Sequence, residues 1–312
     1  MGRFVSQGGS AKLGALASQS EETLPMKSIP FACAAVLFGA APALACMTET
    51  DITISNDGQD VIGTLCSTDD AAAPTVLLLH GFTGSRDELA SDAVPDGVFA
   101  YTAKALAAAG YQSLRIDFRG SGESLADLTF ADTTFEGQIS DAEAAMAYLA
   151  DQPMEKVYVI GWSQGGLVAA SLAGRGADLA GVALWNAVAD PRATFTALFS
   201  AEVLDSAIAA DASESIEVTL PWDATLTLNG AFFDGIATLD PLAEIANYGG
   251  PLFTANGMTD TLVAPASGQD FVDANGVGTV YTADMDHVFD IFAVAEDLDA
   301  MIAETIAFFD AT

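Results

Sequence analysis

The feature that most constrains this chain is a glycine-flanked serine that lies between two apolar runs. Residues 157–160 are apolar and mostly β-branched or aromatic, which is typical of a buried strand. They lead into Gly161-Trp162-Ser163-Gln164-Gly165, and the run 167–173 that follows favours a helix. A strand, a tight turn and a helix in this order hold a serine in a strained conformation with its hydroxyl exposed at the strand end. Gly161 and Gly165 fit this turn because side chains there would clash with the neighbouring elements.

The first 45 residues differ from the rest of the chain, and we expect them to be a leader. Residues 1–25 are polar and rich in Gly and Ser, so we expect them to be disordered or a mis-annotated start before Met26. Residues 26–45 combine Lys27, a long apolar run and the small-residue site Ala43-Leu44-Ala45, which predicts a secretory signal peptide. The protein is then exported, to the periplasm or the medium. A retained anchor helix is one alternative to this interpretation.

Two cysteines remain after the leader, Cys46 and Cys66. They flank two alternating segments around Asp57-Gly58, which is a hairpin signal and brings the cysteines close together. In an exported protein we expect a disulfide between them, with two unpaired thiols as the alternative. Lipidation of Cys46 is a less favoured possibility, because Ala43 stands where a leucine is expected.

Residues 46–312 have the size of one α/β domain, and the whole chain has a formal net charge of −33. So acidic a surface argues against nucleic acid and anionic membranes as partners. Once the leader is removed, we expect no stable membrane span. The sequence contains neither a Walker loop nor a dinucleotide fingerprint.

Strands and helices alternate through most of this domain, which predicts a mostly parallel central sheet flanked by helices. Thr133 and Glu136 have the spacing of a capping box at the start of one helix. Regularity breaks over about 190–249, which we interpret as a small cap insertion containing a helix and a hairpin. The predicted strands are 75–79, 113–117, 157–160, 181–185, 251–256 and 278–281, and the predicted helices include 98–109, 134–151 and 293–309.

The two histidines of the chain have different expected roles. His287 lies on the loop after the last strand, and such loops gather at the sheet edge that also carries Ser163. We therefore predict Ser163 as a nucleophile and His287 as the base that removes its proton. His80 opens the turn that contains Gly81, and we expect a structural histidine that forms hydrogen bonds within that turn.

An acid and two N–H donors complete this predicted site. Asp260 lies just past a strand end and follows Ser163 and precedes His287 in the chain, so it is the predicted acid. Asp190, past the preceding strand, is the alternative. The backbone N–H groups of Phe82 and Gln164 are the predicted oxyanion donors, and removing one such donor typically costs about 3 kcal/mol. The Phe82 ring either lines the acyl pocket or packs in the core.

Five short segments occur in an order that resembles the α/β-hydrolase family: His80-Gly81-Phe82-Thr83-Gly84, Asp117-Phe118-Arg119-Gly120, Gly161-Trp162-Ser163-Gln164-Gly165-Gly166, Gly257-x-x-Asp260-x-x-Val263 and Asp286-His287-Val288-Phe289. The chain looks most similar to feruloyl- and cinnamoyl-esterase-like and serine-aminopeptidase-like members. The resemblance implies an α/β-hydrolase fold, in which the hairpin predicted above is N-terminal and the 190–249 cap insertion shapes the substrate pocket. It also implies hydrolysis of a small-molecule carboxylic ester through an acyl-enzyme, with no cofactor or metal. Ser121 and Asp286 depart from the family pattern, since many relatives carry histidine and glycine there.

Two alternatives to an esterase remain open. An aminopeptidase- or amidase-like enzyme would hold a substrate amine with carboxylates of the cap, for which Glu202, Asp205, Glu214 and Glu217 are available. A non-catalytic binding protein on the same scaffold is the less favoured alternative.

Overall fold

The computed structural model describes residues 48–126 and 128–312. The predicted leader segments 1–25 and 26–45, and Cys46 with its predicted disulfide to Cys66, lie outside the described residues. Within the described ranges, each helix is too short or too polar to span a membrane.

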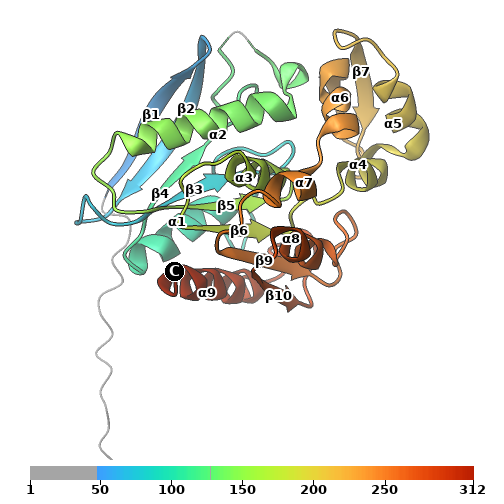
Figure 1. Cartoon of the computed structure of the whole chain (residues 1–312). Helices are drawn as coiled ribbons and strands as arrows, with labels where there is room; N and C mark the ends of the chain where they lie inside the picture. Colours follow the sequence, from blue (N-terminus) through green and yellow to red (C-terminus); the bar gives the residue numbers. More distant parts are fainter. Residues whose placement is uncertain (1–47, 127) are drawn as a thin grey trace, which may run out of the picture. The chain divides into compact units, whose positions relative to one another are not determined.

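A sheet of eight strands forms the centre of the described domain, in the order β1-β2-β4-β3-β5-β6-β9-β10 (Figure 1). Neighbouring strands from β4 to β10 pair in parallel, and the hairpin β1–β2 joins β4 antiparallel. The prediction of a mostly parallel sheet is therefore confirmed. The bounds are β1 (Thr48–Asn56), β2 (Gln59–Ser67), β3 (Thr75–Leu79), β4 (Gln112–Ile116), β5 (Val157–Trp162), β6 (Gly181–Trp185), β9 (Leu252–Gly257) and β10 (Thr279–Ala283).

The turn of the β1–β2 hairpin lies where the sequence places it. Asp57 and Gly58 both have left-handed backbone, with φ of 52° and 79°. A two-residue turn of this kind matches the right-handed twist of the strands that it joins, and Asp-Gly is among the sequences that adopt it at low cost.

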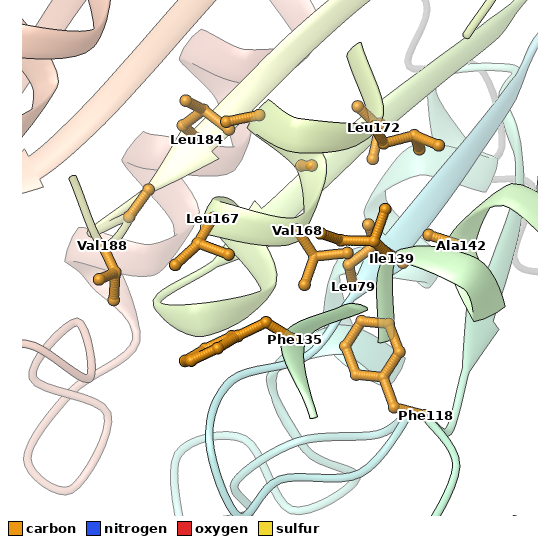
Figure 2. Close-up of a cluster of buried hydrophobic side chains, with 14 of the residues drawn as sticks. Leu79, Phe118, Phe135, Ile139, Ala142, Leu167, Val168, Leu172, Leu184 and Val188 are labelled. Carbon is orange, nitrogen blue, oxygen red and sulfur yellow. The ribbon is translucent and has the colours of Figure 1, made fainter. Parts of the chain in front are cut away.

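Helices cover both faces of the sheet, as alternating strand residues require. Val76 and Leu78 of β3 face the cluster formed with α1 (Val98–Ala108) and α9 (Glu296–Asp310). Leu77 and Leu79 face the opposite cluster, formed with α2 (Phe135–Ala150), α3 (Gln164–Gly174) and α8 (Ser267–Asn275). Figure 2 shows part of this second cluster, in which Leu79, Ile139, Leu167 and Val168 are among the labelled side chains.

Helix α2 begins one residue later than the predicted capping box would place it. The Thr134 hydroxyl accepts a hydrogen bond from Gly137 N at 3.0 Å, so Thr134 and not Thr133 is the N-cap. Thr133 is buried and accepts instead from the Gln138 side chain at 3.1 Å. Glu136 forms an ion pair with Arg175 of the α3 end at 2.7 Å. Because Thr133 and Thr134 are adjacent, the sequence allows either of them to be the N-cap, and the burial of Thr133 leaves Thr134 in that position.

The region 190–249 contains more helix than predicted. The expected hairpin is present as β7 (Ser215–Thr219) and β8 (Thr225–Asn229), and three helices accompany it (Figure 1): α4 (Pro191–Phe199), α5 (Ala201–Ile208) and α6 (Gly230–Thr238). We call these five elements the cap. Helix α7 (Pro241–Ile245) packs instead on α3, where a Cβ on Gly174 would clash with the backbone of Glu244. A short 3-10 turn, η1 (Phe130–Asp132), precedes α2 and contacts β8.

Candidate active site

Ser163 lies in the strained turn between β5 and α3. Its backbone has φ of 55° and ψ of −118°, which a residue with a Cβ adopts only when its surroundings enforce it. The Ser163 N–H donates to Trp185 O at 2.9 Å, and its carbonyl accepts from Val188 N at 3.1 Å. A Cβ at Gly161 would clash with the carbonyl of Gly165, and one at Gly165 with the carbonyl of Leu79. The two glycines are thus required by close backbone approach, as the sequence predicts.

The predicted nucleophile, base and acid lie within hydrogen-bonding distance of one another. His287 Nε2 is 3.0 Å from Ser163 Oγ, and His287 Nδ1 is 2.7 Å from Asp260 Oδ2. Ser163 comes from the end of β5, Asp260 from the loop after β9 and His287 from the loop after β10, so three strands deliver them to one edge of the sheet. In this chain of contacts the imidazole can take a proton from the serine hydroxyl while the carboxylate stabilises the charged ring.

Asp260 is held as an acceptor, and the alternative acid is committed elsewhere. Asp260 Oδ1 accepts from the N–H groups of Leu262 at 2.8 Å and Val263 at 2.9 Å, which leaves Oδ2 for the histidine. The side chain of Asp260 is 1% exposed. Asp190 is exposed and caps α4 by accepting from Ala193 N at 2.9 Å. The structure therefore pairs His287 with Asp260 and gives Asp190 a capping contact.

Asn186 fixes the backbone of the histidine loop, and sequence reasoning did not identify it. Its side-chain amide donates to the carbonyl oxygens of Asp286 at 3.2 Å and His287 at 3.0 Å. Its side-chain oxygen accepts from Gly257 N at 2.8 Å, at the end of β9. Asn186 has φ of 41°, and asparagine tolerates this left-handed region better than most residues. An asparagine directly after the buried strand β6 is the signal that could have revealed it.

Trp162 adds a further contact to the same loop, since its indole Nε1 donates to His287 O at 3.2 Å. The ring also packs on Phe289, with centroids 5.0 Å apart. The residue before the serine and the histidine loop are thus joined directly.

The two predicted N–H donors come from different elements. The amide of Gln164 is the first of α3, where no acceptor exists within the helix. The Gln164 side chain is buried and donates to Gln138 Oε1. Phe82 follows Gly81, whose Cβ position would lie 3.4 Å from Ser163 Cβ, and both residues line the same cavity as Ser163.

The Phe82 ring lines that cavity and is also part of a phenylalanine cluster with the cap. Its centroid lies 5.4 Å from that of Phe195, 5.5 Å from Phe232, 5.6 Å from Phe130 and 5.9 Å from Phe199. The loop after β3 is thereby packed against α4 and α6. The two roles that the sequence left open for this ring are therefore not exclusive.

A cavity of about 480 Å³ opens beside Ser163 and His287. Its walls are mainly apolar, and Trp222 (55% exposed) and Phe292 (70% exposed) border it from the β7–β8 turn and the loop before α9. The four cap carboxylates considered for amine recognition are exposed, and among the described residues the cavity walls include none of them: Glu202, Asp205, Glu214 and Glu217. The cavity suits an apolar group of modest size.

His80 has a structural environment. Its Nδ1 donates to Gly81 O at 2.8 Å, and its Nε2 accepts from Phe118 N at 3.1 Å. The residue is 1% exposed, and burial lowers the pKa of the ring, against the raising effects of the Gly81 carbonyl and of the charges on Asp117 and Asp141. A neutral ring with both nitrogens bonded to backbone has no nitrogen left for a substrate.

Comparisons with known proteins agree with this architecture. A family model described as alpha/beta hydrolase fold matches residues 74–205. None of the curated proteins compared with the chain matches it.

Solved structures extend the likeness over most of the chain. Est1E from Butyrivibrio proteoclasticus with bound ferulic acid superposes with a TM-score of 0.63 at 20% identity, over 82% of this chain and 99% of that one. The alpha/beta hydrolase GrgF from a Penicillium species gives 0.68 at 14% identity, over 85% and 99%. An esterase of Pyrococcus furiosus gives 0.61 at 22% identity, over 85% and 92%. The α/β-hydrolase fold expected from the motifs is thus confirmed, and the structure of this chain is similar to those of esterases.

Proposed function

We propose that the protein hydrolyses carboxylic esters through an acyl-enzyme on Ser163. The observation that carries this proposal is the continuous hydrogen-bonded path from Ser163 Oγ through the His287 ring to Asp260. Structural similarity to Est1E with ferulic acid and to the Pyrococcus furiosus esterase supports an ester as the substrate.

The geometry supports the following sequence of steps. His287 Nε2 takes the Ser163 proton while Oγ attacks the ester carbonyl carbon, and the ionised Asp260 stabilises the imidazolium that results. The tetrahedral oxyanion accepts hydrogen bonds from the N–H groups of Phe82 and Gln164, close to the positive end of α3. The imidazolium then gives its proton to the departing alcohol. His287 then takes a proton from water as the water attacks the acyl-enzyme carbonyl, and the imidazolium returns that proton to Ser163 Oγ as the acyl–Oγ bond breaks and the acid leaves.

The cavity favours esters over substrates with a charged amine. Its walls are largely apolar, and the cap carboxylates that would bind an amine are exposed away from it. The four carboxylates considered for the aminopeptidase- or amidase-like alternative are therefore not available to a substrate amine in this cavity, and the carboxyl group that does line it, that of Glu88, accepts a hydrogen bond from Gly81 N. A small apolar or aromatic acyl group would fill the space beside Ser163.

Hydrolysis of p-nitrophenyl acetate by Ser163→Ala tests the proposal. We expect kcat to fall by about 10⁶-fold, because the nucleophile is lost. Ser171→Ala is the matched control: Ser171 is a buried serine of α3 whose hydroxyl has no hydrogen-bond partner within the described residues, so activity should persist. Equal hydrolysis by the wild-type protein and Ser163→Ala would refute the proposal. Failure of a fluorophosphonate probe to label the wild-type protein would favour a non-catalytic binding protein.

We also propose that the chain is exported, on the basis of the signal-peptide pattern in residues 26–45. Expression in a bacterial host, followed by fractionation and N-terminal sequencing, checks this. An N-terminus at Cys46 in the periplasm or medium is the expected result. A membrane-bound product with a lipid on Cys46 would instead indicate lipoprotein processing, and a full-length cytoplasmic product would contradict export.

A further inference from the structure

The loop between β3 and α1 carries three successive charged residues, of which the third has an unusual environment. Arg86 pairs with Asp117 and Glu123, and Asp87 pairs with Arg115 at 2.6 Å. Glu88 takes part in none of the ion pairs found in residues 48–126 and 128–312. It lines the cavity that contains Ser163 and His287.

The Glu88 carboxyl group contacts the backbone of the loop that carries Phe82. Its Oε1 accepts a hydrogen bond from Gly81 N. Its other oxygen lies over Gly84, where a Cβ would clash with the carboxyl group. Glu88 itself has left-handed backbone, with φ of 62°, so the protein holds this residue in a costly conformation that directs the carboxyl at the loop.

These contacts determine the direction of the Phe82 N–H. The carbonyl of Gly81 accepts from His80 Nδ1 at 2.8 Å and from Gly84 N at 3.1 Å. In a trans peptide the N–H points opposite to the carbonyl, so anchoring Gly81 O aims the N–H of Phe82. Glu88 fixes the preceding peptide through Gly81 N, and Gly81 is therefore held on both sides.

We propose that Glu88 is a positioning residue for the oxyanion site. The protonated Glu88 side chain holds Gly81 in place, and ionisation of Glu88 weakens the site. The inference rests on the proposed ester hydrolysis and adds to it a residue that does not touch the substrate's reacting atoms. Ionisation would put a negative charge beside the place where the oxyanion develops, and like charges repel strongly in a poorly hydrated site.

The surroundings of Glu88 favour the protonated form. Burial raises the pKa of Glu88 to about 8, the Gly81 N–H opposes this, and the negative charge of Asp117 adds to it. The other titratable or charged groups nearby are Arg86, which is paired with Asp117, Asp87, which is paired with Arg115, the neutral His80, and His287 across the cavity. At pH 7 Glu88 is then mainly a carboxylic acid, and it ionises as the pH passes through about 8.

The test compares pH profiles between pH 6 and 9.5 for the wild-type protein and Glu88→Gln, which keeps an acceptor oxygen but does not ionise. Two rates are measured: kcat/KM for p-nitrophenyl acetate and the rate of fluorophosphonate labelling of Ser163. We expect both wild-type rates to fall about tenfold with a midpoint near pH 8. In Glu88→Gln the fall should be absent while the rates at pH 7 stay close to wild type. Glu123→Gln, which removes an exposed carboxylate of the same ion-pair group, should keep the wild-type profile.

Glu88→Ala separates positioning from stability. It should lower kcat at every pH with little change in KM, and Glu88→Gln should restore kcat at pH 7. A wild-type protein that labels and hydrolyses without an alkaline fall would overturn the inference, as would equal falls in wild type and Glu88→Gln. Complete absence of labelling and hydrolysis in the wild type would instead remove the proposed function, and with it this role of Glu88.

Discussion

The two histidine loops of this protein show how the same side chain acquires different properties. His80 follows β3 and His287 follows β10, so both lie at the carboxyl ends of strands. Both nitrogens of His80 bond to backbone groups, whereas those of His287 bond to Asp260 and Ser163. The His287 side chain is 14% exposed and borders the cavity, while His80 is fully enclosed. The partners of the two nitrogens, more than position on the sheet, decide what each ring can do.

The largest expected effect comes from removing the ring beside Ser163. His287→Ala should lower kcat for p-nitrophenyl acetate by about 10⁶-fold, because no base then takes the serine proton. The free energy of unfolding, measured by urea denaturation, should change little, since the ring faces the cavity. If activity fell only as much as the fraction of folded protein, His287 would be a structural residue, as His80 is.

A smaller effect is expected when the ring stays but loses its acid. Asp260→Asn should lower kcat by about 10⁴-fold, because the amide favours the wrong tautomer of His287 and does not stabilise the imidazolium. Asp190→Asn is the control, since this carboxylate caps α4 and lies in an exposed position. The comparison is read from steady-state kinetics at pH 8. If Asp190→Asn were the more damaging change, the proposed acid would be wrong.

The smallest effect concerns His80 and appears in stability. His80→Phe should lower the free energy of unfolding by about 2 kcal/mol at pH 7.5, because Phe118 N loses its buried acceptor. The deficit should shrink towards pH 5. The folded-state pKa of His80 lies below the unfolded value of about 6.5, so the unfolded wild-type chain binds more protons in acid and wild-type stability falls there. The phenylalanine variant lacks this contribution.

Denaturation curves at the two pH values check this third prediction. A deficit that is the same at pH 5 and pH 7.5 would mean that burial does not keep His80 neutral. His80→Phe also removes one of the two hydrogen bonds that anchor Gly81 O, so a modest fall in kcat is expected. A fall in kcat as large as that of His287→Ala, with unchanged stability, would mean that His80 acts in the chemistry.

The sheet and its edge could be predicted because short-range patterns determine them. Residues 157–160 and 181–185 are apolar runs of strand length, and Asp57-Gly58 is a turn signal that two adjacent residues carry. The contacts that depend on the tertiary fold could not be predicted in this way. Thr133 and Thr134 are equal as caps until burial distinguishes them, and the cap helices are only 8 or 9 residues long, so each offers few turns in which a period can be recognised.

The supporting residues of the site were missed for the same reason. Asn186 is one asparagine among many polar residues until β6, β9 and the histidine loop are brought together around it. Glu88 is one of 43 acidic residues, and its sequence neighbours Arg86 and Asp87 suggest a solvated charged turn. Only the fold shows that its carboxyl group contacts Gly81 N and lies against Gly84.

The contact between Phe82 and the cap has a consequence for how substrate range can change. Phe82 supplies a proposed N–H donor and also packs its ring on Phe195 and Phe232 of the cap. Substitutions that reshape the cap to admit a new acyl group are therefore expected also to disturb the backbone that we propose stabilises the oxyanion. Variants that evolve to hydrolyse a new ester would have to gain both substrate binding and kcat, so substrate selectivity and turnover rate are coupled in this protein.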